Sequence, residues 1–187
     1  MTRFCLVRHG QTEWNSRHQI QGRVDIPLND SGRSQSVKAS EKLRKLNINW
    51  DYVYSSPLKR AYETAQIVCE GSQIKKEIVV LDDLIEREFG ELEGGLVGEE
   101  NYKRMNSKDT KGLEQIEDLE KRSVGVLRKL ALSHPNSNIL IFTHSQVIKA
   151  ILLYLDKDFD FTCALDNLSL NFFEVDEDKI KVIKINV

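Results

Sequence analysis

Cysteine and proline are scarce in this chain, which has only three of each among its 187 residues. Cys5, Cys69 and Cys163 are odd in number, far apart and without C-x-x-C spacing, which excludes a disulfide framework and favours reduced thiols in a cytoplasmic protein. Two of them adjoin apolar runs and are expected in the core. Histidines and carboxylates also lack ligand spacing such as H-x-x-x-H, so we expect no bound metal.

Long hydrophobic runs and dense clusters of positive charge are missing as well. The apolar stretch Phe4 to Val7 is too short for a signal-peptide core or a membrane span, so neither export nor membrane insertion is expected. The net charge is -2 without a Lys/Arg block, and we therefore expect no nucleic acid and no anionic membrane as partner. Neither G-x-x-x-x-G-K-[ST] nor a strand-linked G-x-G-x-x-G is present, which argues against an NTPase or a dinucleotide-binding protein.

The apolar residues that are present alternate between two kinds of segment. With 40% hydrophobic residues, the chain can bury a substantial core, and we expect one domain over residues 1–187. Short continuous apolar runs predict buried strands, whereas helical spacing of apolar residues predicts helices. The predicted strands are 3–7, 52–54, 78–81 and 139–142, and the predicted helices are 31–46, 114–132 and 146–155. This order predicts an α/β fold with a mostly parallel central sheet flanked by helices on both faces.

Local signals add detail at the helix starts and at the C-terminus. Asn29 or Ser31 is suited to cap the helix 31–46, while Ser56 followed by Pro57 predicts a helix start that puts Arg60 in the first turn. Residues 168–175 and 180–185 flank the polar turn 176–178 and predict an antiparallel edge hairpin. Residues 95–113, poor in apolar side chains, interrupt the alternation and are expected to form a short lid or surface excursion.

Polar residues follow the ends of the predicted strands. Ligands of open α/β sheets bind outside the carboxyl ends of the strands. There the sequence has Arg8 and His9, residues 55–60, Glu86 and His144. Two guanidinium forks can satisfy several oxygens of a phosphate dianion, and a neutral imidazole has one ring nitrogen free to attack phosphorus. The set therefore predicts recognition of a phosphoryl group.

These residues stand in motifs that resemble the histidine phosphatase superfamily, which includes the phosphoglycerate mutases. The family's R-H-G signature is matched by Leu6-Val7-Arg8-His9-Gly10-Gln11-Thr12 and extended by Glu13-Trp14-Asn15. The further matching blocks, in the family order, are Gln21-Gly22 with Asp25-Ile26-Pro27-Leu28, Ser55 to Ala61 with Thr64-Ala65, Glu86 before Phe89-Gly90, and Thr143-His144. The resemblance covers nearly the whole chain and fits the small phosphatase branch with its phosphoglycerate mutase-like fold.

The resemblance implies a role for each matching residue. His9 is expected to be the phosphorylated nucleophile, and Glu86 the proton donor and acceptor. The residues expected to hold the phosphoryl group or the substrate are Arg8, Asn15, Gln21, Gly22, Arg60, His144 and Ser145. No metal or organic cofactor is implied. The expected substrate is a small-molecule phosphate monoester, and the expected assembly is a monomer or a homodimer.

Alternatives remain open at this point. A phosphoglycerate mutase uses the same phosphohistidine, although the family's mutases have a longer insertion than residues 95–113. A non-catalytic sensor of phosphorylated ligands is a second alternative, because Ser145 stands where the family usually has glycine. Glu86 lies in an acidic stretch that is also typical of a solvated surface. On the lid, Lys103, Arg104, Lys108 and Lys111 are candidates to meet a second anionic group of the substrate. His18 and His134 are interpreted as surface or structural residues.

Overall fold

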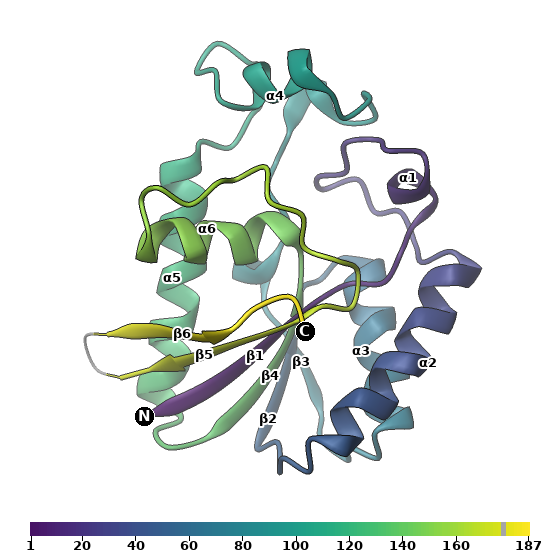
Figure 1. Cartoon of the computed structure of the whole chain (residues 1–187), viewed down its shortest axis with the longest axis vertical. Coiled ribbons are helices and arrows are strands. Elements are labelled where there is room, and N and C mark those ends of the chain that lie inside the picture. The colour runs from purple at the N-terminus through teal and green to yellow at the C-terminus, as the bar shows by residue number, and fades with distance from the viewer. Residues whose placement is uncertain (177–178) are drawn as a thin grey trace.

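One six-stranded sheet organises the protein (Figure 1). The computed structural model describes residues 1–176 and 179–187. The strands are β1 (Thr2–Arg8), β2 (Tyr52–Ser55), β3 (Ile78–Val80), β4 (Asn138–Thr143), β5 (Leu170–Val175) and β6 (Ile180–Lys184). They lie in the order β3-β2-β4-β1-β5-β6, with β1 to β4 parallel and the last two pairings antiparallel. The predicted mostly parallel sheet and its C-terminal edge hairpin are confirmed, while Glu177 and Asp178 of the predicted turn lie outside the described residues.

Helices cover both faces of the sheet, as predicted. The helices are α1 (Glu13–Ser16), α2 (Asp30–Lys45), α3 (Lys59–Gly71), α4 (Glu99–Met105), α5 (Ile116–Ser133) and α6 (Ser145–Leu155), with 3-10 turns η1 (Asp82–Leu84) and η2 (Gly90–Leu92). Figure 1 shows α2 and α3 on one face and α5 and α6 on the other, with α1 and α4 beyond the carboxyl ends of the parallel strands. In the part of the chain that the structure describes, no helix is long and apolar enough to cross a membrane.

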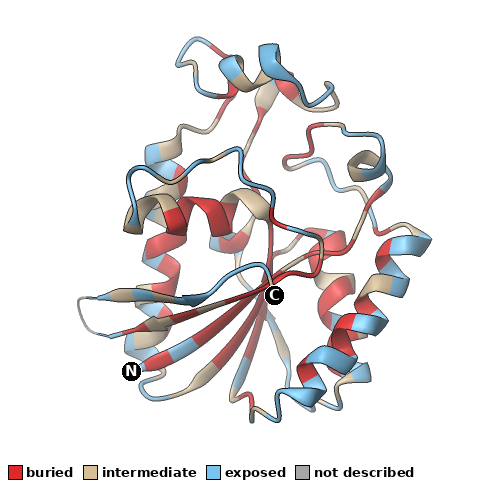
Figure 2. Ribbon diagram, viewed as in Figure 1, coloured by how far each residue is buried: buried red, intermediate tan, exposed pale blue. Residues whose placement is uncertain are grey.

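The two layers of core follow from the alternation of side chains along each strand. Phe4 and Leu6 of β1 belong to the hydrophobic cluster under α5 and α6, whereas Cys5 and Val7 belong to the cluster under α2 and α3. The central strands are accordingly buried along most of their length (Figure 2). This burial on both sides explains why they read as continuous apolar runs. Cys5 and Cys69 lie in this core and Cys163 is exposed, as expected for two of the three thiols.

The helix starts follow local rules in α2 but not in α3. The Asn29 side chain accepts a hydrogen bond of 2.8 Å from the amide of Gly32 and caps α2. The prediction that Ser56 caps the next helix is wrong, because α3 begins at Lys59 after Leu58. A distant carboxylate replaces the predicted cap, since Asp25 accepts a hydrogen bond of 2.7 Å from the Lys59 amide. Arg60 lies in the first turn, as predicted.

The predicted lid contains more structure than its composition suggested. Residues 95–113 include α4, and Met105 and Leu113 from this segment are buried against Ile20 and Phe89 in a separate small cluster. The segment is thus packed on the loop that contains Ile20. Its apolar residues are few, but they are gathered on one side.

Candidate active site

Three adjacent parallel strands end at the same level and bring three polar side chains together. The register pairs Arg8 of β1 with Thr143 of β4, so that His9 and His144 follow directly at the sheet edge. The amide of His9 donates to the carbonyl of Thr143 (3.0 Å), and the amide of Ser56 donates to the carbonyl of Phe142 (2.9 Å). The two imidazole rings lie with their centroids 5.1 Å apart. The order β2-β4-β1 therefore builds the site from chain segments far apart in the sequence.

The tautomer of His9 is fixed by its own turn. Its Nδ1 lies 2.7 Å from the carbonyl oxygen of Gly10, and because a carbonyl only accepts hydrogen bonds, the ring proton must be on Nδ1. This leaves the lone pair on Nε2. Gly10 is required at this turn, since a Cβ there would lie 2.7 Å from the backbone oxygen of Gly32. The Asn167 side chain holds the His9 carbonyl with a hydrogen bond of 2.8 Å.

His9 is neutral at physiological pH. Burial lowers its pKa well below 6.5, and the positive charges of Arg60 and Arg8 lower it further. Only the hydrogen bond to the Gly10 carbonyl acts in the opposite direction. The neutral ring is the form with a nucleophilic nitrogen.

Arg60 is the most completely enclosed cation of the site. Its side chain is fully buried, and its Nη2 and Nη1 atoms donate to the carbonyls of Gly22 (2.6 Å) and Val24 (3.0 Å). Its Nε donates to His9 Nε2 at 3.3 Å. Burial lowers the Arg60 pKa to about 10, while the charge of Glu86 raises it, so the guanidinium stays positive at neutral pH. Arg60 thus links the unprotonated Nε2 atom of His9 to the 22–24 loop.

The guanidinium group of Arg8 has a buried hydrogen-bond donor that no described residue uses. Its Nη1 donates to the carbonyl of Leu165, whereas its buried Nε has no hydrogen-bond partner among the described residues. Burial lowers the Arg8 pKa, and the charges of Glu86 and Asp166 raise it. A buried donor without a partner is costly unless a ligand supplies the acceptor.

Only one of the two ring nitrogens of His144 has a hydrogen-bond partner among the described residues. Its Nε2 lies 2.7 Å from Ser56 Oγ, while Nδ1, also buried, has no partner within residues 1–176 and 179–187. Burial lowers the pKa of His144 well below 6.5, and the positive charge of Arg60 lowers it further. Ser56, predicted as a helix cap, is instead committed to this imidazole. The next residue, Ser145, is the first of α6.

Glu86 has the properties of a buried acid. Its side chain is 4% exposed, and its Oε1 accepts a hydrogen bond of 2.9 Å from the amide of Arg87. Burial raises the pKa of Glu86 above its usual 4.5, although the Arg87 amide and the charges of Arg60 and Arg122 lower it in part. The reading of Glu86 as part of a solvated acidic surface is therefore wrong.

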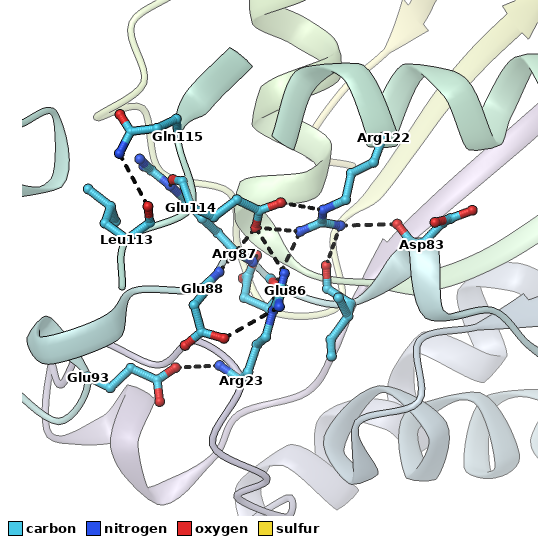
Figure 3. Close-up of polar contacts among 11 residues, drawn as sticks. Arg23, Asp83, Glu86, Arg87, Glu88, Glu93, Leu113, Glu114, Gln115 and Arg122 are labelled. Atoms are coloured by element: carbon cyan, nitrogen blue, oxygen red, sulfur yellow. Dashed lines mark hydrogen bonds and ion pairs between the residues drawn. The ribbon is translucent and has the colours of Figure 1, made fainter. Parts of the chain in front are cut away.

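The backbone around Glu86 is held by an ion-paired cluster that the sequence did not reveal (Figure 3). Arg122 of α5 donates to the carbonyls of Ile85 (2.7 Å) and Glu86 (3.2 Å), and its Nε and Nη2 bind both carboxylate oxygens of Glu114 (2.6 and 2.9 Å). Arg23 contacts the Glu86 carbonyl (3.3 Å) and Glu114 (3.3 Å) as well. Burial alone would raise the Glu114 pKa, but its hydrogen bond and ion pair with Arg122 lower it overall. Glu114 therefore stays ionised between two arginines.

A cavity of about 450 Å³ opens next to these groups. Arg8, His9, Asn15, Gln21 and Ser145 of the predicted site line it together with Glu86. The Gln21 Oε1 atom accepts from Asn15 Nδ2 (3.3 Å), which leaves Gln21 Nε2 buried and without a partner among the described residues. Arg60 and His144 are fully buried next to His9, and Gly22 contributes its carbonyl to Arg60; these three do not line the cavity.

The lid cations do not reach this cavity. Arg104 is paired with Glu91 and Lys103 with Glu99, and both pairs are exposed. The segment instead presents Val97, together with Tyr102 and Met105, to the cavity. None of the four basic lid residues lines the cavity, so the structure gives no support to the hypothesis that they meet the substrate, which stays a prediction. Of the two remaining histidines, His18 lines the cavity and His134 is structural, 2.7 Å from the hydroxyl of Tyr54.

Sequence reasoning missed several residues of the site. Ser56, Glu114 and Arg122 act through contacts with segments distant in sequence, for which the chain gives no local pattern. Lys149 also lines the cavity, although its place in an apolar helical repeat gave no sign of this. Within the described chain, no group of three His, Cys, Asp or Glu side chains is placed to hold a metal ion.

Comparisons with known proteins agree with this arrangement. The family model of the histidine phosphatase superfamily (branch 1) matches residues 4–187. The uncharacterized phosphatase PhoE of Bacillus subtilis is 37% identical over 190 residues, which covers 100% of this chain and 95% of the relative. A crystal structure of a phosphoserine phosphatase mutant from Entamoeba histolytica, in complex with phosphoserine, superposes with a TM-score of 0.84 at 29% identity and covers 100% of this chain and 97% of that one.

A phosphoglycerate mutase structure from Bacillus anthracis superposes with a TM-score of 0.85 at 23% identity and covers 99% of this chain and 92% of that one, so the fold alone does not separate mutases from phosphatases. Some mutases of the same superfamily match less of the chain in sequence. The 2,3-bisphosphoglycerate-dependent phosphoglycerate mutase of Pelagibacter ubique is 39% identical over 94 residues, which is 50% of this chain and 40% of the relative. The phosphatase PhoE of Bacillus subtilis and phosphoserine phosphatase 1 of Hydrogenobacter thermophilus, by contrast, match 100% of this chain in sequence. These comparisons support a phosphoric monoester hydrolase.

Proposed function

The chain belongs to the histidine phosphatase superfamily, and on that premise we propose that it hydrolyses small phosphate monoesters through a phosphohistidine formed on His9. The observation that carries the proposal is the state of His9. Its proton is held on Nδ1 by the Gly10 carbonyl, its pKa is lowered by burial, and its Nε2 lone pair adjoins Arg60. A neutral, oriented imidazole next to a buried guanidinium is suited to attack phosphorus.

In the first step, His9 Nε2 forms a bond to phosphorus while the bond from phosphorus to the ester oxygen breaks. Protonated Glu86 gives its proton to the departing oxygen, so that an alcohol leaves and Glu86 becomes a carboxylate. Six buried side-chain atoms have no partner among the described residues, and three of them are nitrogen atoms next to His9 or in the cavity wall. We assign these three, Arg8 Nε, Gln21 Nε2 and His144 Nδ1, to the oxygens of the transferred phosphoryl group. Arg60, whose Nε lies 3.3 Å from His9 Nε2, adds positive charge next to the attacking nitrogen.

In the second step, a water molecule attacks the phosphohistidine. Glu86 takes a proton from the water, the bond from phosphorus to His9 Nε2 breaks, and inorganic phosphate is released. The raised pKa of Glu86 serves both directions, because it keeps the acid available for the first step and makes the carboxylate a stronger base for the second. No metal or organic cofactor takes part in this scheme.

The test is a panel of phosphate monoesters with wild type and His9→Ala. Phosphate release is followed alongside interconversion of 2- and 3-phosphoglycerate, and rapid acid-free quenching with labelled substrate detects the phosphohistidine. We expect phosphate release by wild type, a labelled histidine, and loss of both in His9→Ala. Interconversion without release would make the chain a mutase. Binding without either activity would make it a sensor of phosphorylated ligands.

A further inference from the structure

Lys149 is a buried cation in the wall of the cavity. It lies on α6, is 6% exposed, and is among the side chains that line the cavity. Its Nζ atom donates one hydrogen bond, of 2.8 Å, to the carbonyl of Phe161 and lies 5.8 Å from the centroid of that ring. An ammonium group carries three protons for donation. The carbonyl therefore satisfies only part of its capacity.

No ion pair holds this ammonium among the described residues, and the charges of Glu86 and Asp160 raise its pKa only from beyond ion-pair distance. In the described ranges 1–176 and 179–187, no carboxylate lies within ion-pair distance of Lys149 Nζ. Burial lowers the Lys149 pKa, and the largest charge effect on it comes from Arg8, another cation of the same cavity. Buried charges in proteins are usually paired, because desolvation of an unpaired charge is costly. An unpaired buried lysine facing a cavity indicates an anionic group supplied by a ligand.

The position of Lys149 fixes which part of the substrate it meets. Ser145, Gln146 and Lys149 share one face of α6, since residues three and four apart are neighbours on a helix. Lys149 follows His144 by five residues, which places it roughly 7 Å further along the helix axis. It is thus displaced from the phosphoryl position by about the length of a short carbon chain. Val97 and Met105 also line the cavity and offer apolar contact.

We propose that Lys149 binds a carboxylate carried by the leaving group, which makes short phosphorylated hydroxy acids and amino acids the preferred substrates. The proposal rests on the proposed phosphatase activity. A single point charge suits a carboxylate, whereas the phosphoryl group is met by the guanidinium groups of Arg8 and Arg60. The Entamoeba histolytica phosphatase was solved with phosphoserine, a ligand that carries this combination of groups.

The experiment measures selectivity between substrates that differ in one carboxylate. The two pairs are 3-phosphoglycerate with glycerol 3-phosphate, and phosphoserine with phosphoethanolamine. The variants are Lys149→Met and Lys149→Gln, of which the second keeps a donor for the Phe161 carbonyl. Lys157→Met is the matched control, because Lys157 lies just beyond α6 but is exposed and paired with Glu120. The readout is the ratio of kcat/KM within each pair.

We expect wild type to prefer the carboxylated member of each pair. Both Lys149 variants should lower the ratio about 10- to 100-fold, the loss of one charge-assisted hydrogen bond, while Lys157→Met leaves it unchanged. An unchanged ratio in both Lys149 variants would overturn the proposal, and so would an equal fall of kcat/KM for all four substrates, which indicates a structural role. Phosphate release that survives in His9→Ala would instead overturn the proposed mechanism, independently of the ratio.

Discussion

At the scale of single residues, burial acts in opposite directions on the proposed acid, Glu86, and the proposed nucleophile, His9. It lowers the pKa of His9 and raises that of Glu86, so that the imidazole is neutral while the carboxyl group retains its proton to higher pH than an exposed glutamate. The reaction needs both of these forms together. Desolvation therefore favours both the neutral form of His9 and the protonated form of Glu86.

The role of Glu86 predicts a dependence on the leaving group. We expect Glu86→Gln to lower kcat about 10² to 10⁴-fold on alkyl phosphates, because an alkoxide must be protonated as it leaves. The loss should be much smaller on p-nitrophenyl phosphate, since a nitrophenolate leaves without a proton. Steady-state kinetics on both substrates check this. Equal losses on the two substrates would mean that Glu86 does not protonate the leaving group.

The raised pKa of Glu86 also predicts a pH profile. Burial raises it above 4.5, so activity on alkyl phosphates should hold above the range in which an ordinary glutamate has already ionised and should fall as pH rises through the raised value. In Glu86→Gln this alkaline decline should be absent. The kcat/KM profiles of both proteins, measured on glycerol 3-phosphate, give the comparison. An alkaline decline that persists unchanged in the variant would assign it to another group.

At the scale of elements, α5 positions the segment that carries Glu86. Arg122 holds the carbonyls of Asp83, Ile85 and Glu86, and Glu114 fixes the guanidinium (Figure 3). These bonds span 36 to 39 residues between Arg122 and its carbonyl acceptors. Helix α5 and the segment 83–86, which are far apart in the sequence, are thus joined by hydrogen bonds from one guanidinium group.

Arg122 is therefore expected to act as a positioning residue. Arg122→Met should lower kcat on alkyl phosphates by about 10-fold through misplacement of Glu86, with a smaller effect on p-nitrophenyl phosphate and an altered alkaline limb of the pH profile. Arg128→Met is the control, because Arg128 lies on the same helix but contacts Tyr154. If both substrates lose the same factor, Arg122 serves stability rather than the placement of the acid.

The helix cap at Asn29 is expected to contribute to the stability of the protein but not to its activity. Its side chain accepts from the Gly32 amide at the start of α2. Asn29→Ala should lower the free energy of unfolding by about 1 kcal/mol, as is usual for the loss of an N-cap, while kcat/KM changes little. Urea denaturation measures the first quantity and the substrate panel the second. A large loss of kcat/KM with unchanged stability would place Asn29 in the site instead.

The same elements show which features local sequence can predict. Asn29 was a sound prediction because a cap and its amide are three residues apart. Ser56 was not, because its hydroxyl is taken by His144, 88 residues away, and Asp25 caps α3 from a different loop. The strands and the sheet follow from the periodicity of apolar residues, whereas the motif residues follow from residue types at the strand ends and from the resemblance to the histidine phosphatase superfamily. The supporting contacts depend on how distant segments meet, which no local pattern encodes.

At the scale of the whole molecule, the strand order decides which residues meet. Because β4 lies between β1 and β2, the segments after all three strands converge, and the site combines residues near 9, 56 and 144. The cavity next to them is lined in part by the 95–113 segment, whose buried Met105 packs against Ile20 and Phe89. In the proposed mechanism, the phosphoryl group would therefore lie at the sheet edge, and the leaving group would face α6 and this segment.

Two fully buried neutral histidines make global stability dependent on pH. The folded-state pKa values of His9 and His144 are lowered well below 6.5, so as pH falls below about 6.5 the unfolded chain binds protons that the folded protein does not. Each histidine should then cost up to about 1.4 kcal/mol of unfolding free energy per pH unit. Glu86 acts in the opposite sense, because its raised pKa lets the folded protein take up that proton at a higher pH than the unfolded chain does.

The histidine effect is therefore best measured where Glu86 cannot contribute. In the Glu86→Gln background, urea unfolding between about pH 7 and pH 5.5 should show stability falling towards acid, and adding His144→Asn should reduce that slope by roughly half, since one of the two buried imidazoles no longer titrates on unfolding. The comparison of slopes is independent of any constant loss caused by the substitution itself. Parallel lines for the two proteins would mean that His144 is protonated in the folded state, and would also remove the argument that it meets the phosphoryl group as a neutral ring.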